Sequence, residues 1–464
     1  MRRTSDKARA MMGSWIEHAI LWHVYPLGFV GAEREARARD GVVHRLGHLT
    51  SWLDYAVDLG VSGLLLGPIF ASSTHGYDTI DYFRVDPRLG DDADFDAFVS
   101  AARTRGLRII LDGVFNHVGS DYPAFQRALA GGPGSPEAHW FKLTWPAARS
   151  AGELPDYATF EGHRHLVALN HDDPGVADHV VAVMRHWLSR GVSGWRLDAA
   201  YAVPRAFWSK VLPRVRADFP EAYFVGEVIH GDYAGFVRET GIDAVTQYEL
   251  WKAIWSSLND GNLFELAWAL KRHDAMLETF VPQTFIGNHD VTRIASQLHD
   301  ERHLAHALVV LMTSGGTPSI YAGDEQRFHG IKEHRVGGDD AIRPAFPKKP
   351  ADLALFGWPT YRLHQQLIGL RRRHPWLHRA RSRVITINRS DLLLETSYGA
   401  DRLWVVLNLA DAGIVRTIET EADRLAGDIE LSHKGGATDV SVPPHGWGIL
   451  GRRNEARAAD ADMS

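Results

Sequence analysis

The chain has 464 residues, of which 45% are hydrophobic and 10% aromatic, so it can bury the cores of two or three domains and is not a disordered protein. Its formal net charge is −6, and its longest basic run, residues 371–373, ends a helical pattern instead of marking a basic face, which argues against a nucleic-acid-binding protein. The absence of cysteine excludes disulfides and thiolate metal sites.

The N-terminal segment is basic but not apolar. Residues 1–15 lack the apolar core of a secretory signal peptide, which predicts a cytoplasmic protein. The most apolar stretch, residues 304–323, is interrupted by His, Thr, Ser and Gly, and a membrane span needs ~18 consecutive apolar residues. We therefore expect no contact with a membrane.

Short apolar runs alternate with amphipathic segments of helical period from residue 19 to about residue 376. This alternation is typical of repeated βα units around a parallel sheet. Eight such units predict a (β/α)8 TIM barrel in the α/β class. The eight strands are expected within residues 19–30, 60–70, 106–116, 191–200, 222–228, 244–250, 284–290 and 317–325.

Two regions interrupt this alternation. A Gly-, Pro- and aromatic-rich segment after the third strand is too long for an ordinary loop, which predicts a short inserted domain. Near residue 378 the helical period gives way to alternating strands separated by turns, which predicts a C-terminal antiparallel β-sandwich. The expected domains are the barrel (15–117 and 173–376), the insertion (118–172) and the C-terminal domain (377–453), with flexible tails at 1–14 and 454–464.

Charged and polar residues gather where four of the predicted strands end. In barrel enzymes the active site lies at the carboxyl ends of the strands. A structural ion pair explains one charged strand end equally well, whereas four at the same rim favour an active site. The residues are Asp112, Asn116 and His117 after the third strand, Arg196 and Asp198 after the fourth, Glu227 after the fifth, and Asn288, His289 and Asp290 after the seventh.

Carboxylates that converge in this way are suited to acid, base and nucleophile chemistry. Retaining glycoside hydrolysis uses one carboxylate to attack the anomeric carbon and a second, whose pKa is raised, to donate a proton. Glu227 lies in the apolar segment FVGEVIHG, which favours the protonated form. Asp198 has Arg196 two residues before it on the same strand face, which favours the ionised form. The pattern therefore predicts Glu227 as the acid and Asp198 as the nucleophile.

The segments DGVFNHVG, GWRLDAA, FVGEVIHG and FIGNHD resemble, in order, the four signature regions of glycoside hydrolase family 13, the α-amylase family. The resemblance extends from about Trp15 to about Gly451. It implies a barrel enzyme with Asp198 as nucleophile, Glu227 as general acid/base, and Asp290 as the carboxylate that holds sugar hydroxyls and stabilises the oxocarbenium-like transition state.

The same resemblance implies further contacts with the substrate. Tyr77, in the segment THGYDTIDYFRVDPRLGD, matches the family's aromatic platform, and a tyrosine ring suits the apolar face of a sugar; core packing is the alternative. His75, in the same segment, either contacts the substrate or makes a hydrogen bond within its loop. The resemblance also implies sugar contacts by His117, Arg196 and His289, and an organising role for Asp112.

Two segments, residues 77–91 and 166–176, are similar to the cyclomaltodextrinase and neopullulanase branch of the family. Members of that branch hydrolyse α-1,4 and often α-1,6 bonds, which implies a small or cyclic α-glucan substrate. The chain also departs from the branch. Its first barrel strand is not preceded by the usual N-terminal β domain, so a homodimer would not be built by that route. Ile229, two residues after Glu227, stands where that branch commonly has an aromatic residue. The residues after Asp198, Ala199–Ala202, match neither the α-amylase nor the cyclodextrinase ending of this motif.

The proposed chemistry requires no cofactor. A structural calcium ion is a candidate with Asn116 as one ligand, although the rest of the six to eight oxygens that calcium needs are not identified in residues 118–172. Two alternatives stay open: a transglycosylase or a sucrose- or trehalose-acting enzyme on the same scaffold, and a non-catalytic binding protein. The presence of Asp198, Glu227 and Asp290 disfavours the second. Bond preference, ring size and oligomeric state are not predicted.

Overall fold

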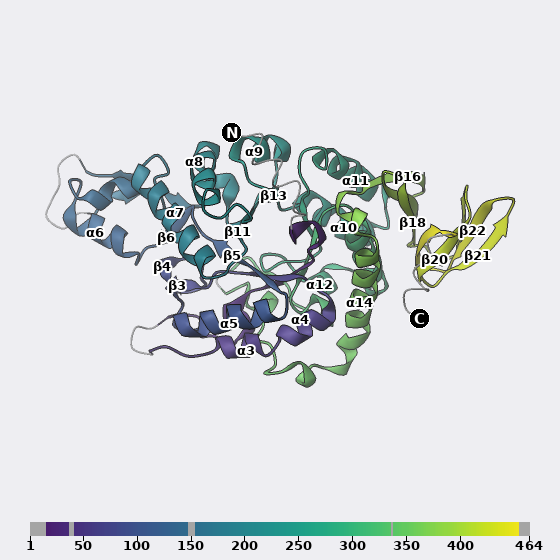
Figure 1. Cartoon of the computed structure of the whole chain (residues 1–464), viewed down its shortest axis with the longest axis horizontal. Coiled ribbons are helices and arrows are strands. Elements are labelled where there is room, and N and C mark those ends of the chain that lie inside the picture. The colour runs from purple at the N-terminus through teal and green to yellow at the C-terminus, as the bar shows by residue number, and fades with distance from the viewer. Residues whose placement is uncertain (1–14, 37–40, 147–153, 336, 454–464) are drawn as a thin grey trace.

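The structure, a computed structural model, describes residues 15–36, 41–146, 154–335 and 337–453. The tails expected at 1–14 and 454–464, and residues 147–153 of the expected insertion, lie outside the described residues. Figure 1 shows a central body of helices and strands, with the segment around α6 at one end and the C-terminal strands at the other. None of the helices within the described ranges is long and apolar enough to cross a membrane.

Eight short parallel strands form one sheet at the centre of the molecule, in the order β13-β12-β11-β5-β2-β1-β15-β14. A parallel bridge from Thr246 to Gln283 joins the two outer strands and closes the ring. Each strand overlaps its predicted range, so the (β/α)8 barrel is confirmed. The strands are β1 (Leu21–Val24), β2 (Gly63–Leu66), β5 (Arg108–Gly113), β11 (Gly194–Leu197), β12 (Tyr223–Gly226), β13 (Ala244–Val245), β14 (Gln283–Phe285) and β15 (Thr317–Tyr321).

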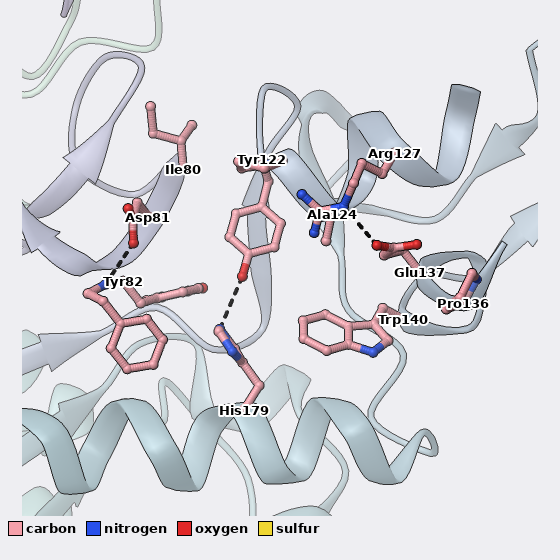
Figure 2. A pocket seen from close by; sticks show the side chains of 12 residues that line it. Ile80, Asp81, Tyr82, Tyr122, Ala124, Arg127, Pro136, Glu137, Trp140 and His179 are labelled. Carbon is pink, nitrogen blue, oxygen red and sulfur yellow. Dashed lines mark hydrogen bonds and ion pairs between the residues drawn. The ribbon is translucent and has the colours of Figure 1, made fainter. Parts of the chain in front are cut away.

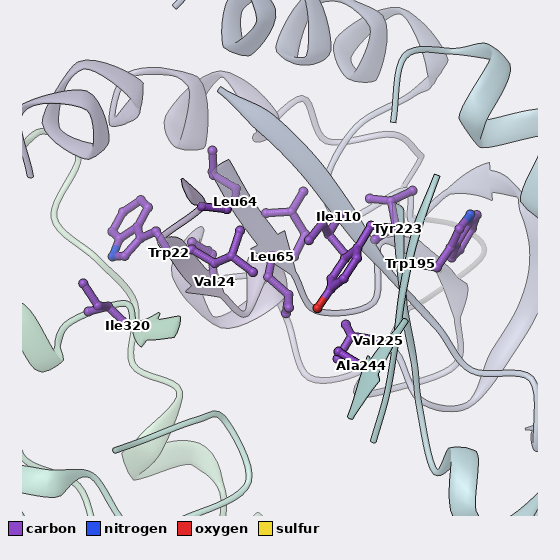
Figure 3. Close-up of a cluster of buried hydrophobic side chains, with 14 of the residues drawn as sticks. Trp22, Val24, Leu64, Leu65, Ile110, Trp195, Tyr223, Val225, Ala244 and Ile320 are labelled. Atoms are coloured by element: carbon purple, nitrogen blue, oxygen red, sulfur yellow. The ribbon is translucent and has the colours of Figure 1, made fainter. Parts of the chain in front are cut away.

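The barrel strands are apolar because both of their faces are covered. Every residue of β1, β2 and β11 is buried, as expected for a parallel sheet with side chains inside the ring and helices outside it. Figure 3 shows Leu64, Leu65 and Ile110 packed together, with Trp22 and Trp195 on either side of them. This packed core fixes the strand ends that carry the polar residues.

The helices between the strands follow the amphipathic segments of the sequence. Asp91 begins one of them with a capping box, in which it accepts bonds from the first turn while Asp94 accepts a bond from the Asp91 backbone. The helices are α2 (Pro26–Phe29), α3 (Leu46–Thr50), α4 (Leu53–Leu59), α5 (Asp92–Thr104), α7 (Pro174–Ser189), α8 (Arg205–Arg216), α9 (Tyr233–Thr240), α10 (Tyr248–Asp260), α11 (Phe264–Met276), α12 (Ile294–Gln297), α13 (Leu304–Thr313) and α14 (Trp358–Arg373).

The segment between β5 and α7 forms small sheets beside the barrel. A three-stranded antiparallel sheet has the order β6-β10-β9, and β7 pairs with β8. The hairpin of β3 (Phe70–Ser72) and β4 (Thr79–Val85) follows β2. The elements of the segment are β6 (His117–Gly119), α6 (Pro123–Gly131), β7 (Leu143–Thr144), β8 (Asp156–Tyr157), β9 (Thr159–Phe160) and β10 (His163–Ala168).

The C-terminal region consists of two antiparallel sheets, of order β16-β17-β18-β23-β20 and β19-β22-β21. Leu393 and Trp404 pack with Val440 of the second sheet, whereas the neighbouring Leu392 and Leu394 join the main core. Because successive side chains of a strand point to opposite faces of the sheet, both faces of the larger sheet are apolar. The strands are β16 (Arg381–Ile387), β17 (Asp391–Tyr398), β18 (Asp401–Asn408), β19 (Ile414–Ile418), β20 (Ala422–Gly427), β21 (Glu430–Lys434), β22 (Ala437–Val442) and β23 (Trp447–Arg452).

Candidate active site

The polar residues predicted to converge do lie at one end of the barrel, which we call the rim. Parallel register places Arg196 of β11 beside Asp112 of β5. Asp198 follows β11 directly, and Glu227 follows β12. Because all barrel strands run in the same direction, their carboxyl ends meet at this rim.

Arg196 is the centre of the rim. Its Nη1 donates to both oxygens of Asp112 at 2.7 Å and to Asp198 Oδ1 at 3.0 Å. Its Nη2 lies 2.8 Å from Glu227 Oε1. The Arg196 side chain is 4% exposed and the Glu227 side chain 10%. One buried guanidinium therefore holds three carboxylates, not only the one that sequence spacing indicated.

Glu227 has two further hydrogen bonds that fix its carboxylate. Tyr248 Oη donates to Oε1 at 3.0 Å, and the backbone N–H of Ala199 donates to Oε2 at 3.1 Å. Asn288 Nδ2 in turn donates to Tyr248 Oη at 2.9 Å. Ala199 has a φ of +43°, a left-handed conformation that is uncommon for alanine. This turn directs its N–H at Glu227, so the unusual residues after Asp198 help to position the acid.

A second group at the rim surrounds Asp290. His289 Nε2 lies 3.0 Å from Asp290 Oδ2, and Arg343 Nη2 donates to Asp290 Oδ1 at 2.8 Å. The His289 ring stacks on the Tyr77 ring at a centroid distance of 5.5 Å, and Tyr77 Oη donates to Asp112 Oδ2 at 3.0 Å and contacts His289 Nε2. Tyr77 thus links the Asp290 group to the Arg196 group.

The electrostatics of the two groups differ. Burial raises the pKa of Asp198 well above its usual value, and the carboxylates of Glu227 and Asp112 add to this effect, while Arg196 opposes it. Burial would also raise the pKa of Asp290, but His289, Arg343 and Arg196 outweigh it and hold that pKa well below its usual range. Arg196 thus favours the ionised form of Asp198, as the sequence predicted, but burial has the larger effect on that pKa.

The remaining candidates lie next to these groups. His75 accepts a hydrogen bond from the Tyr77 N–H at 3.2 Å through Nδ1, which is the loop contact given as its alternative role. The His117 ring stacks on Phe160 of β9 at a centroid distance of 4.7 Å, and its Nε2 is buried without a hydrogen-bond partner among the described residues. Burial lowers the pKa of His117 to about 3. His117 is therefore a neutral ring with a free polar atom.

Asn116 was the candidate calcium ligand. Its side-chain Nδ2 lies 3.2 Å from His117 Nδ1, and calcium prefers oxygen ligands. Within the described ranges, the two groups of three His, Asp or Glu with metal-like spacing are Asp300, His303, His445 and His44, Asp91, Asp94. Calcium there stays a prediction, and no step below depends on it.

Sequence reasoning missed two residues of the rim. Tyr248 begins α10 and lies near the end of the range predicted for the sixth strand (244–250), so applying the strand-end rule to that strand would have found it. Arg343 lies in the long loop between β15 and α14, where no periodicity or motif marks it. Its guanidinium also packs over the Tyr25 ring, 4.6 Å from the centroid, which orients it toward Asp290.

A cavity of about 480 Å³ lies away from the rim, between α6, α7 and β4. Figure 2 shows Tyr122 bonded to His179 in this cavity and Arg127 paired with Glu137 at its edge. None of the residues predicted to act on a substrate lines it. The cavity separates the inserted segment from the barrel helix and is not the place where the catalytic groups meet.

Comparisons with known proteins agree with this geometry. Residues 24–384 match the family described as alpha amylase, catalytic domain. The chain is 28% identical over 431 residues to a cyclomaltodextrinase of Bacillus sp, covering 86% of this chain and 74% of that protein. It is 30% identical over 389 residues to neopullulanase 2 of Thermoactinomyces vulgaris, covering 77% and 63%.

Among solved structures, the debranching enzyme of Nostoc punctiforme is similar over nearly the whole chain. It is 26% identical, with a TM-score of 0.80 and coverage of 94% of this chain and 98% of that one. Some curated relatives are longer than this chain. The match spans 48% of a maltogenic alpha-amylase from Bacillus acidopullulyticus. The match therefore covers the catalytic barrel and the C-terminal strands, but not everything that the relatives contain.

Proposed function

Because this chain belongs to the α-amylase family of glycoside hydrolases, as its sequence motifs predicted, we propose that it hydrolyses small linear or cyclic maltooligosaccharides with retention of anomeric configuration. The observation that carries the proposal is the Arg196 group, in which one buried guanidinium holds the carboxylates of Asp198 and Glu227. Both carboxylates are thereby presented to the same sugar unit.

In the first step, an oxygen of Asp198 attacks the anomeric carbon while Glu227 gives its proton to the glycosidic oxygen, and the bond to the leaving sugar breaks. Arg196 holds both carboxylates at the rim, Asp198 through Nη1 and Glu227 through Nη2. In the second step, Glu227 takes a proton from water, and the resulting hydroxide oxygen displaces Asp198. The Ala199 N–H and Tyr248 Oη hold Glu227 in place through both steps.

Asp290 serves a different purpose in this proposal. Its pKa is held well below the usual range, so it remains negatively charged next to the reacting sugar. A fixed negative charge stabilises the positive charge that develops on the sugar ring in the transition state. Tyr77, stacked on His289 at the same rim, is placed to lie under the apolar face of the ring.

The preference for small substrates is supported by the relatives that are named cyclomaltodextrinase and neopullulanase. Ile229, two residues after Glu227, is 40% exposed. An aliphatic residue there provides less stacking area for a long leaving group than an aromatic residue would. We therefore expect the enzyme to bind short or cyclic glucans better than starch.

The test is a substrate panel of cyclodextrins, pullulan, starch, sucrose, maltotriose and small cyclic glucans with α-1,6 bonds, in which product size and first-formed anomer are recorded. We expect α-anomeric products and the highest kcat/KM on small glucans. Cellobiose, whose bond is of the β type, is the negative control. A β-anomeric first product, or no cleavage of any α-glucan, would contradict the proposal. Dominant transfer products at high sugar concentration would identify a transglycosylase instead.

A further inference from the structure

Three residues gather where the barrel meets the C-terminal domain: Asp300, His303 and His445. Asp300 and His303 precede α13 of the barrel, and His445 lies in the loop between β22 and β23. Their ligand atoms all lie within 4.8 Å of one another. We call them the junction triad. None of them belongs to the rim.

We propose that the junction triad binds a divalent transition-metal ion of the zinc type, which links the barrel to the C-terminal domain. His303 Nε2 and His445 Nδ1 face each other at 3.0 Å. Two nitrogen ligands of tetrahedral zinc, each about 2.0 Å from the metal, are roughly 3.3 Å apart. A shift of a few tenths of an ångström would therefore bring both rings to ligand distance.

His445 is held in the orientation that a metal ligand needs. Its Nε2 lies 2.8 Å from Asp411 Oδ1, so Nε2 carries the proton and Nδ1 presents its lone pair to His303. A carboxylate behind a histidine is the usual second partner in metal sites. The backbone of His445 adopts a φ of +52°, a conformation that few side-chain-bearing residues take and that often marks functional positions.

His303 supplies the second observation. It is 5% exposed, and its Nδ1 is buried without a hydrogen bond in the part of the chain that the structure describes. In the metal-free arrangement, His303 Nε2 must keep a proton to bond to His445 Nδ1. The other nitrogen of the same ring, His303 Nδ1, is then a buried bare lone pair. A metal ion between the rings would replace that proton. With a metal ion on Nε2, the ring proton would lie on Nδ1, next to the backbone of Leu258, and the bare buried lone pair would be removed.

Asp300 completes the triad as a carboxylate ligand. It accepts hydrogen bonds from Arg302 Nε at 2.9 Å and Nη2 at 2.6 Å. The Arg302 side chain is 56% exposed and can leave Asp300 at little cost. Two imidazoles and one carboxylate form a donor set that zinc accepts and that calcium, which prefers oxygen, does not. Solvent would fill the fourth position, since the Asp300 side chain is 30% exposed.

The test uses the full chain, with any affinity tag removed and metals stripped by a chelator. Zinc binding is measured by titration calorimetry, and cobalt(II) is added separately as a spectroscopic probe of tetrahedral coordination. We expect one equivalent of zinc and tetrahedral cobalt absorption bands, with binding at least tenfold weaker in His445→Gln and in His303→Gln. If His303→Gln does not fold, His445→Gln alone decides, because His445 lies in the loop between β22 and β23 and not in the barrel.

Two further variants separate the triad from unspecific binding. His44→Ala removes the other metal-like group, His44 with Asp91 and Asp94, and should leave the tight equivalent unchanged. Arg302→Ala should tighten zinc binding severalfold, because it frees Asp300. No stoichiometric binding by the parent chain, or binding that survives His445→Gln, would overturn the proposal, as would a tight equivalent that is lost with His44.

Discussion

The rim and the junction triad both gather histidines and carboxylates, but they balance charge in opposite ways. At the rim, the Arg196 side chain is 4% exposed and touches three carboxylates, so the cation is permanent and internal. At the junction, the arginine beside Asp300 is 56% exposed, while His303 is buried. The junction thus depends on rings that can exchange a proton for a metal. The comparison indicates that the rim keeps a constant arrangement of charges, whereas the junction can bind or release a metal ion.

The largest effect is expected from Glu227→Gln. The substitution keeps the shape of the side chain but removes the proton that Glu227 gives to the leaving sugar. Loss of a general acid lowers rates by ~10²–10⁴. The measurement is kcat/KM on maltotriose and on a cyclodextrin, with circular dichroism to verify folding. Glu239→Gln, on the outer helix α9 and 59% exposed, is the control. Unchanged hydrolysis in Glu227→Gln would show that the rim is not the catalytic centre.

Arg196→Ala should damage both stability and activity. Without the guanidinium, Asp112, Asp198 and Glu227 lose their shared partner, and breaking a buried ion pair costs about 3–5 kcal/mol. Asp198, whose pKa is already raised by burial, becomes still harder to ionise. Urea unfolding and kcat/KM measure the two effects, and Arg205→Ala on the surface is the control. A variant with parental activity would mean that Arg196 is structural only.

The sequence predicted the rim well because its signals are local. Strand ends can be recognised from apolar runs of fewer than ten residues, and the two-residue spacing of Arg196 and Asp198 correctly placed them on one face. That Arg196 also holds Asp112 depends on the register between β11 and β5, which spacing along the chain does not encode. Burial inside the closed barrel raises the pKa of Asp198, and the carboxylates around Arg196 add to this effect, so the protonation of Asp198 could not be derived from local sequence.

Other features depend on segments that are far apart in the chain. Arg343 reaches Asp290 from a loop 53 residues later, and the loop has no period that would predict a contact. The junction triad joins His303 to His445, which are 142 residues apart. The fold class could be inferred from repeated local patterns, whereas these pairs exist only once the barrel has closed and the C-terminal sheets have packed on it.

Arg343→Ala tests whether Asp290 needs its own fixed cation. Loss of a charge-assisted hydrogen bond costs about 1.5–3 kcal/mol, so kcat/KM should fall by roughly 10- to 10²-fold. Because Arg343 helps to hold the pKa of Asp290 down, its removal should also raise that pKa, which an NMR titration of the Asp290 carboxyl would measure. The exposed Arg362 on α14 offers a control. An unchanged titration of Asp290 would show that His289 and Arg196 suffice to keep it ionised.

The smallest effect on activity is expected from His364→Gln, which lies in neither region. Burial lowers the pKa of His364 to about 4, below the ordinary value of 6.5. The unfolded chain therefore binds a proton between these values while the folded chain does not, so this histidine makes the protein lose stability as pH falls from about 6.5 to about 4. The loss is on the order of 3 kcal/mol.

Glutamine cannot take up that proton, so the free energy of unfolding of the variant, measured in urea, should fall less steeply as pH falls, with unchanged activity at pH 7. The unfolding is best followed in a chelator, so that metal at the junction triad does not contribute, and the exposed His299→Gln is the control. If both variants lose stability as steeply as the parent, the acid sensitivity comes from groups other than His364, and the histidines of the junction triad are then the first to examine.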